Sequence, residues 1–257
     1  MIRLALALVL LAAPARAAQR VVSLNLCTDQ MLVLLAPAQV AALSPLSRDP
    51  SISFVAARAA HLPVVRPSAE AVLALHPDLV LATRWGAQQT VALLAARGVR
   101  VVRVGLPEDF AAIRRQVAHL ARVLGVQARG AALIARMDAR LAALPRPSHP
   151  VRALVWEPNG WGDGAGTLAA SVLRAAGLVN AAPFRGAGRI GLERLVAHPP
   201  DLLIVPAAPR FPSLATNLFH DPALARIRRV AIPPDLMICG GPFTARAASL
   251  LARAASR

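Results

Sequence analysis

The sequence predicts an α/β fold with two lobes, each built on a parallel sheet, joined by one long helix. Three observations predict it: short apolar runs alternate with helical patterns, a proline-rich break near the middle restarts the alternation, and one motif occurs twice. Such alternation is typical of parallel sheets covered by helices. Of 257 residues, 56% are hydrophobic and 16% charged, which excludes a disordered chain. Past the N-terminus the apolar residues come in short blocks, which excludes an integral membrane bundle.

The first eighteen residues have the three parts of a secretory signal peptide. Arg3 supplies a positive region, residues 4–13 form an apolar stretch too short to span a membrane, and residues 15–17 read Ala-Arg-Ala, a small-x-small cleavage site. A buried N-terminal helix would instead show a polar face. We therefore expect residues 1–18 to be removed by cleavage near Ala17 or Ala18, and the mature protein to be exported.

The first half of the chain alternates predicted strands and helices. Apolar runs predict strands at 20–24, 39–43, 79–82 and 100–104, and helical spacing lies between them at 29–35, 69–75 and 88–97. Helical spacing then continues over 108–124. We assign residues 19–124 to an N-terminal lobe.

A long helix is predicted to connect the two lobes. Its apolar stripe includes Leu133, Met137 and Leu144, and a proline-rich break at 145–150 follows. Strand and helix patterns then restart at 151–156, 167–176, 202–205 and 243–255. We assign residues 125–146 to the connecting helix and residues 147–257 to a C-terminal lobe.

An internal repeat supports two similar lobes. Each copy is a short helix led by a glutamate that ends near Pro-Asp and enters an apolar strand. Glu70 precedes Asp78 by eight residues, and Glu193 precedes Asp201 by the same number. Proline stops the helix and the apolar run behind it enters the sheet. Two copies 123 residues apart (193 − 70) predict two related lobes.

The chain is strongly basic, with a formal net charge of +16, and every basic side chain other than histidine is arginine. The arginines are scattered, with no run longer than two residues, tyrosine is absent and aromatic residues form only 4%, so the sequence disfavours nucleic-acid binding. Compositional bias, an anionic ligand or an acidic partner surface each explain the charge.

Several segments resemble the class III periplasmic binding proteins, the substrate-binding subunits of ABC importers for iron–siderophores, haem and vitamin B12. The opening strand, Arg20-Val-Val-Ser-Leu-Asn25, is similar to the start of that family, and the Glu-led helix before Pro-Asp is its most recognisable piece. Residues 82–86, 157–167 and 239–244 resemble its cleft loops. The resemblance covers nearly the whole mature chain.

The resemblance implies two Rossmann-like lobes bridged by one long helix, with the ligand in the groove between them. It implies a periplasmic, monomeric binding protein rather than an enzyme, with no cofactor of its own. The expected ligand is a metal chelate, either a ferric siderophore, haem or cobalamin. The expected partner is an ABC permease and ATPase complex in the inner membrane.

Two glutamates are expected to bind the permease. By the resemblance, Glu70 and Glu193 lie at the tips of the two lobes and dock onto permease arginines. Charge pairs of this kind set register and speed encounter more than they add affinity. Each glutamate also suits its helix N-terminus through the macrodipole.

The resemblance also implies a set of ligand contacts in the groove. Tryptophans would supply flat apolar surface, and arginines would pair with anionic groups of a ligand. The candidates are Asn25, Cys27, Trp85, Glu157, Asn159, Trp161, Arg185, Arg189, Cys239, Phe243 and Arg246.

The two cysteines admit three interpretations. Cys27 and Cys239 form a disulfide that ties the lobes together, or contact the ligand, or are small buried hydrophobic residues. The six histidines show no metal-binding spacing, so a complexed metal is favoured over a naked ion.

An alternative function is a nucleotide-binding exported enzyme. The glycine-rich loop at 162–166, from Gly162 to Gly166, follows a predicted strand and precedes a helix, as phosphate-binding loops do. It departs from G-x-G-x-x-G, and no acidic residue stands about 20 residues further on.

Overall fold

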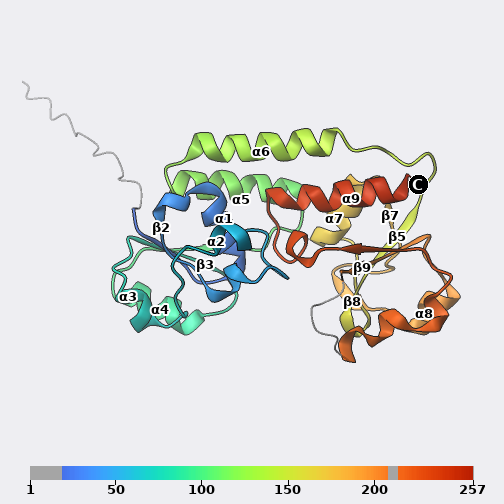
Figure 1. Cartoon of the computed structure of the whole chain (residues 1–257), viewed down its shortest axis with the longest axis horizontal. Helices are drawn as coiled ribbons and strands as arrows, with labels where there is room; N and C mark the ends of the chain where they lie inside the picture. The colour runs from blue at the N-terminus through green and yellow to red at the C-terminus, as the bar shows by residue number, and fades with distance from the viewer. Residues whose placement is uncertain (1–18, 208–213, 257) are drawn as a thin grey trace, which may run out of the picture.

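The protein has two lobes side by side, with a long helix running along one edge of the molecule (Figure 1). The structure is a computed structural model that describes residues 19–207 and 214–256. The predicted signal peptide at 1–18 lies outside the described residues. Each lobe has its own sheet, so the expected two-lobed α/β fold is confirmed.

The N-terminal lobe contains a four-stranded parallel sheet in the order β2-β1-β3-β4. Its central strand β3 is buried along its whole length, as expected of a strand covered on both faces. Side chains of β3 alternate between two clusters: Leu79 and Leu81 pack with α1 and α5, and Val80 packs with α3 and α4. The elements are β1 (Val21–Ser23), α1 (Leu26–Leu35), β2 (Val40–Ala42), α2 (Ala56–Ala59), α3 (Ala69–Leu73), β3 (Leu79–Thr83), α4 (Gln88–Ala96), β4 (Val101–Val104) and α5 (Phe110–Val123).

The C-terminal lobe contains a mixed sheet in the order β10-β9-β5-β6-β8, with β7 also paired to β5. Strands β7, β9 and β10 belong to its parallel part, whereas β6 and β8 run antiparallel to their neighbours. The elements are β5 (Arg152–Glu157), β6 (Trp161–Asp163), α7 (Leu168–Ala175), β7 (Val179–Asn180), β8 (Ala187–Arg189), α8 (Leu192–Ala197), β9 (Leu202–Pro206), β10 (Arg229–Ile232) and α9 (Ala245–Ala255).

The antiparallel part of this sheet corrects the expectation of a purely parallel one. After β5 the chain turns back at once, through Asn159 and Gly160, which have φ angles of +59° and +75°. A Cβ atom on Gly160 would lie 3.2 Å from the carbonyl oxygen of Ile190, so both the backbone angle and the space favour glycine. Because the chain reverses within a few residues, β6 pairs with β5 in the antiparallel direction; a parallel pairing would need a longer crossover, usually through a helix.

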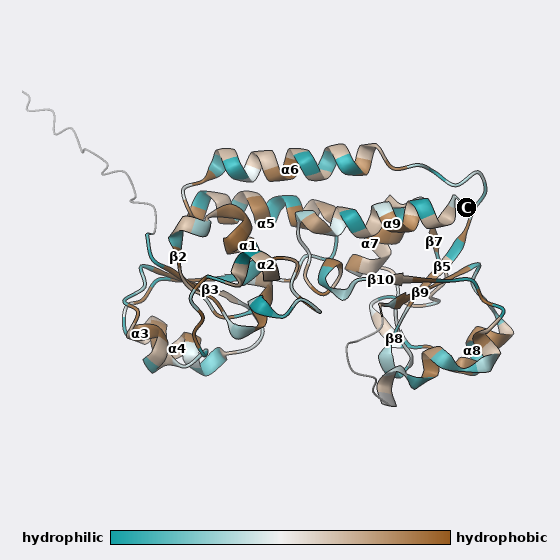
Figure 2. Cartoon of the chain, in the orientation of Figure 1, coloured by the Kyte–Doolittle hydropathy of each residue, from teal (hydrophilic) through white to brown (hydrophobic). Residues whose placement is uncertain are grey.

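The connecting helix α6 (Gln127–Ala142) packs against α5 and α9. Its approach to α5 is close, because a Cβ atom on Gly130 would lie 2.4 Å from the Cβ atom of Ala121. Arg114 of α5 and Asp138 of α6 form an ion pair at 2.6 Å. Figure 2 shows hydrophobic and hydrophilic residues mixed along α6, as expected of a helix with one buried stripe. Among the described residues, no helix combines the length and the apolar character that crossing a membrane requires.

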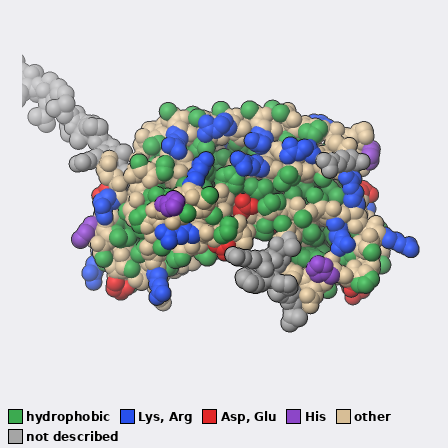
Figure 3. All heavy atoms as spheres, in the orientation of Figure 1, with side chains coloured by type: hydrophobic (Ala, Val, Ile, Leu, Met, Phe, Trp, Pro, Cys, Tyr) green, Lys and Arg blue, Asp and Glu red, His purple; other side chains and the backbone are tan. Residues whose placement is uncertain are grey.

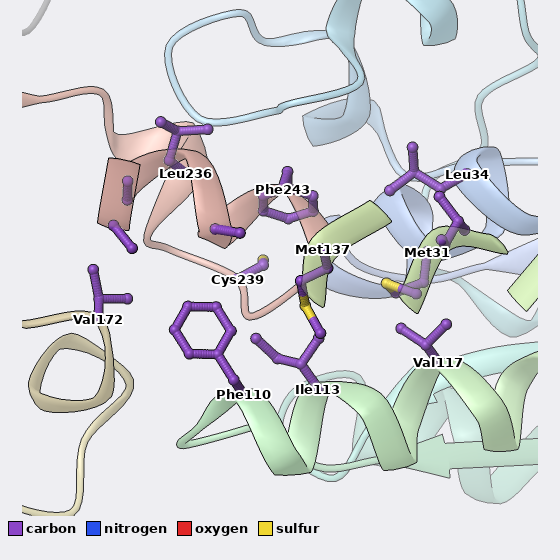
Figure 4. Packing of buried hydrophobic residues seen from close by; sticks show 14 of the residues in the cluster. Met31, Leu34, Phe110, Ile113, Val117, Met137, Val172, Leu236, Cys239 and Phe243 are labelled. Carbon is purple, nitrogen blue, oxygen red and sulfur yellow. The ribbon is translucent and has the colours of Figure 1, made fainter. Parts of the chain in front are cut away.

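One hydrophobic cluster extends through both lobes beneath α6. It joins α1 and α5 of the N-terminal lobe to α7 and α9 of the C-terminal lobe, and Met137 of α6 lies within it. Figure 4 shows Phe110, Met137, Cys239 and Phe243 within this cluster. The lobes are therefore fused along the α6 edge.

A disulfide between Cys27 and Cys239 also joins the lobes, with the two Cα atoms 5.3 Å apart. Cys27 lies in the first turn of α1, and Cys239 lies in the segment before α9. Of the three interpretations of the cysteines, the structure contains the disulfide. Both residues belong to or pack against the shared cluster, on the side of the molecule where the lobes are fused.

Candidate functional site

The main candidate site is an apolar cavity of about 770 Å³ between the lobes. The C-terminal lobe supplies most of its wall, at the carboxyl ends of β5, β9 and β10, and the N-terminal lobe supplies residues 50–52. The carboxyl ends of parallel strands are where open α/β sheets bind ligands. Figure 3 shows hydrophobic side chains gathered between the two lobes. The volume lies within the range of about 300–1,000 Å³ that small-molecule sites occupy.

Three carboxyl groups interrupt the apolar wall: Glu157, Asp163 and Asp235. Burial raises the pKa of Glu157, and the nearby charge of Asp163 raises it further. Burial also raises the pKa of Asp163, and a hydrogen bond with the Thr167 side chain partly offsets this rise. For Asp235, burial again raises the pKa, opposed by backbone hydrogen bonds and by the charge of Arg246. These groups suit hydrogen-bond donors or positive charge on a ligand, and each donates a hydrogen bond itself when protonated.

The tight turn after β5 places two of these carboxyl groups. Glu157 is the last residue of β5, and the reversal at 158–160 returns the chain as β6, which ends at Asp163. The buried indole of Trp156 secures this turn, because its Nε1 donates to the carbonyl oxygen of Ile190 at 3.0 Å. The Trp156 ring also packs edge-on against Phe219, with ring centroids 5.5 Å apart.

Of the ligand contacts expected from the sequence, Glu157 lies in the cavity wall. Exposed side chains near strand ends form a second group: Trp85 after β3, Asn159 and Trp161 in the β5–β6 turn region, and Arg185 and Arg189 beside or within β8. The tryptophans are 71% and 44% exposed, which is unusual for such large apolar side chains. The structure leaves both available to a ligand or partner.

The other candidates have partners within the protein. Asn25 caps α1 by accepting a hydrogen bond from the backbone of Thr28, and the cysteine sulfurs are joined to each other. Phe243 is buried and stacks on Phe54 at a centroid distance of 4.6 Å. The guanidinium group of Arg246 lies over the ring of the same Phe54, 4.8 Å from the ring centroid. A disulfide contains no thiolate, so the cysteines do not serve as thiolate metal ligands.

Sequence reasoning missed the wall that follows β10. Pro233, Pro234, Asp235, Met237 and Ile238 all line the cavity. The sequence did contain a signal, because the short apolar run within 229–232 is followed directly by Pro233-Pro234. A proline pair after an apolar run is consistent with a strand that ends at the edge of its sheet. Residues 229–232 were not among the expected strands, so this edge was not recognised.

Two backbone N–H groups of the glycine-rich loop already donate hydrogen bonds to carbonyl groups of the protein itself. The N–H of Gly164 donates to the carbonyl oxygen of Gly186 at 2.8 Å, and the N–H of Ala165 donates to that of Phe184 at 3.0 Å. A phosphate-binding loop instead directs free backbone N–H groups at its ligand. This geometry disfavours phosphate binding through these two groups.

The repeated motif has the same structural role in both lobes. The Asp78 carboxylate accepts from the backbone N–H of Arg20 at 3.0 Å, just before β1, and the Asp201 carboxylate accepts from that of Arg152 at 2.7 Å, at the start of β5. Each aspartate thus fixes the entry of the first strand of its lobe.

The glutamates of the two repeats are exposed and lie on the same edge of the molecule. Glu70 is in the first turn of α3 and Glu193 in the first turn of α8. Figure 1 shows α3 and α8 on the edge opposite α6, one on each lobe. The arrangement presents two separated carboxylates to a single partner surface.

Comparison with known proteins gives consistent matches. Residues 21–228 match the family model described as periplasmic binding protein. The periplasmic haem-binding protein RhuT from Roseiflexus sp. RS-1, in apo form, has 25% identity and a TM-score of 0.74, and the alignment covers 93% of this chain and 100% of that one. A periplasmic haem-binding protein from Pseudomonas aeruginosa has 25% identity and a TM-score of 0.71, with 93% of each chain covered.

A more distant structure shares the fold. An ABC-type Fe³⁺-hydroxamate transport system protein from Saccharomonospora viridis DSM 43017 has 20% identity and a TM-score of 0.68, and the alignment covers 92% of this chain and 93% of that one. None of the curated proteins compared with the chain matches it.

Proposed function

We propose, since this chain belongs to the periplasmic binding protein family, that it is the substrate-binding subunit of an ABC importer and carries a metal chelate between its lobes. The observation that carries the proposal is the apolar cavity of about 770 Å³ at the carboxyl ends of β5, β9 and β10. Two structural relatives at 25% identity are haem-binding proteins, which supports a metal chelate as cargo. Haem and ferric hydroxamates are the leading candidates, followed by a corrinoid. The protein acts in the periplasm and performs no chemistry.

The cavity would hold the chelate through its apolar wall and orient it through its carboxyl groups. Val155, Ile204 and Met237 offer contact surface to the organic part of a chelate. Glu157, Asp163 and Asp235 serve as its polar anchors, and exposed Trp85 and Trp161 are further proposed contacts. Asn159, Arg185 and Arg189 are proposed contacts at the rim.

The shared core suggests how binding and delivery proceed. Because the lobes are fused beneath α6 and joined by the disulfide, only their far ends are free to adjust around the cargo. These far ends include α3 and α8 (Figure 1), whose residues Glu70 and Glu193 we propose as the contacts to the permease. The distance between Glu70 and Glu193 would then depend on how the lobes close around the cargo, and the permease would bind best at one such distance.

Ligand titration tests the proposal. The purified mature chain is mixed with hemin, ferrioxamine B and cyanocobalamin in turn, and visible absorbance and melting temperature are recorded. A ligand at one hundred times its Kd stabilises the native state by about 2.7 kcal/mol. The proposal fails if none of the three changes either the spectrum or the melting temperature.

A pair of matched variants locates the site. Ile238 lines the cavity and is 48% exposed, and Leu93 on α4 is 51% exposed but does not line it. Ile238→Asp should weaken binding of the chelate identified above by about tenfold or more, because the charge faces the ligand. Leu93→Asp should leave binding unchanged. Equal affinity of the two variants would place the ligand elsewhere.

A further inference from the structure

A groove rich in arginine runs between α6 and α9 and ends near α2. Three adjoining cavities of about 200, 400 and 410 Å³ form it, and Arg140 lines all three. The other arginines in its wall are Arg58, Arg136, Arg246 and Arg253. We call this surface the arginine groove.

The spacing on the two helices explains how the groove acquires its charge. Arg136 and Arg140 are four residues apart on α6, and Arg246 and Arg253 are seven residues apart on α9. Residues four or seven apart lie on the same face of a helix. Because α6 packs against α9, the two arginine rows border the same groove. Arginines that are single in the sequence are thus brought together by the fold.

Little of the positive charge of the groove is balanced within the described part of the chain: Arg246 interacts with Asp235, and no further carboxylate lines the groove. None of the five guanidinium groups forms an ion pair with residues 19–207 or 214–256, and all five side chains are exposed. One described carboxylate, that of Asp235, shares the wall with them. Five positive groups around one concave surface repel one another, and a bound polyanion would relieve that repulsion.

We propose that the arginine groove is a docking site for an extended acidic segment of a partner protein. Guanidinium groups bind carboxylates through paired hydrogen bonds, and a row of them suits a chain with repeated acidic side chains. The half-buried ring of Phe54 and the side chain of Leu250 offer apolar contacts between the charges. The hollow between two helices admits a peptide strand more readily than the flat surface of a bilayer.

The position of the groove makes this partner distinct from the permease. The groove borders α6 and α9, whereas Glu70 and Glu193 lie on the opposite edge (Figure 1). Figure 3 shows a row of basic side chains along this part of the molecule. An acidic partner therefore has access to the protein while the lobe tips are engaged. The proposal goes beyond cargo transport and does not depend on which chelate is carried.

A fluorescent peptide tests the proposal. The probe is a labelled dodecapeptide that alternates glutamate with serine, and its counterpart alternates glutamine with serine. Fluorescence anisotropy compares the mature chain with the triple variant R136Q/R140Q/R253Q and with a control triple variant, R66Q/R97Q/R226Q. The control arginines are exposed and outside the groove, and both variants lose the same net charge.

The expected result is binding of the glutamate peptide and not of the glutamine peptide. Its Kd should rise at least about fivefold in the groove variant and remain within about twofold in the control. Equal weakening in both variants would mean binding to overall charge and would overturn the proposal. So would the absence of peptide binding, or binding of phosphatidylglycerol vesicles in place of the peptide. Both variants should keep the melting temperature of the parent, because the substituted side chains are exposed.

Discussion

Loss of the disulfide between Cys27 and Cys239 should lower the free energy of unfolding by about 3–5 kcal/mol. The perturbation is reduction of the bond, or the double substitution C27A/C239A. The bond joins the first turn of α1 to the segment before α9, across the two lobes. Since the chain contains two cysteines, reduction breaks this one bond and releases two thiols.

The size of the effect follows from the loop that the bond closes. The cysteines are 212 residues apart in the sequence. In the loop-entropy description, a closed loop of this length restricts the unfolded chain by about 5 kcal/mol, and native disulfides commonly contribute about 2–4 kcal/mol. For a chain of this size, each kcal/mol corresponds to about 2–4 °C in melting temperature. We therefore expect a fall of about 10 °C.

Scanning calorimetry on the oxidised, reduced and C27A/C239A proteins measures this fall. Thiol titration confirms that the reduced sample has two free thiols per chain. The variant should melt near the reduced protein and should not respond to reductant. The reasoning is refuted if fully reduced protein melts within about 2 °C of the oxidised form.

Three further predictions concern packing, pH and docking. Gly130→Ala should destabilise the protein by about 1–3 kcal/mol in urea unfolding, because the added methyl group meets α5; an unchanged midpoint would contradict the close approach. Burial raises the pKa of Asp29 to about 7, so the native state holds a proton that the unfolded state loses from about pH 4. Stability should therefore fall as pH rises from 4 to 7, and Asp29→Asn should flatten that slope in pH-dependent melts. Glu70→Lys with Glu193→Lys should abolish uptake and leave chelate affinity intact, and a loss of affinity would place these carboxylates in the ligand site.

Much of the fold follows from local patterns. The apolar run at 79–82 forms the buried strand β3, and the connecting helix expected within 125–146 is α6, which spans Gln127–Ala142. The repeat was also informative, because Asp78 and Asp201 occupy equivalent positions in the two lobes. The sequence did not reveal the antiparallel strands β6 and β8, because they read Trp-Gly-Asp and Ala-Gly-Arg and have no apolar run.

The candidate site was predicted less completely. Glu157 was expected to contact ligand because residues 157–167 resemble a cleft loop of the family, and it lies in the cavity wall. Asp235 and Met237 were missed, because a single acidic or apolar residue after a proline pair has no distinctive pattern. Asn25 and Phe243 were also expected to contact ligand; in the structure Asn25 caps α1 and Phe243 stacks on Phe54. A residue type alone does not reveal whether a side chain turns inward or outward.

Periodicity, breaks and the repeat determined the two-lobed α/β architecture from the sequence, because these signals arise between residues close together in the chain. Only the tertiary structure decided that Cys27 meets Cys239 and that Arg136, Arg246 and Arg253 border one groove. Such contacts join residues over a hundred positions apart, or 212 for the cysteines. They depend on how α1, α6 and α9 pack, which no local pattern specifies.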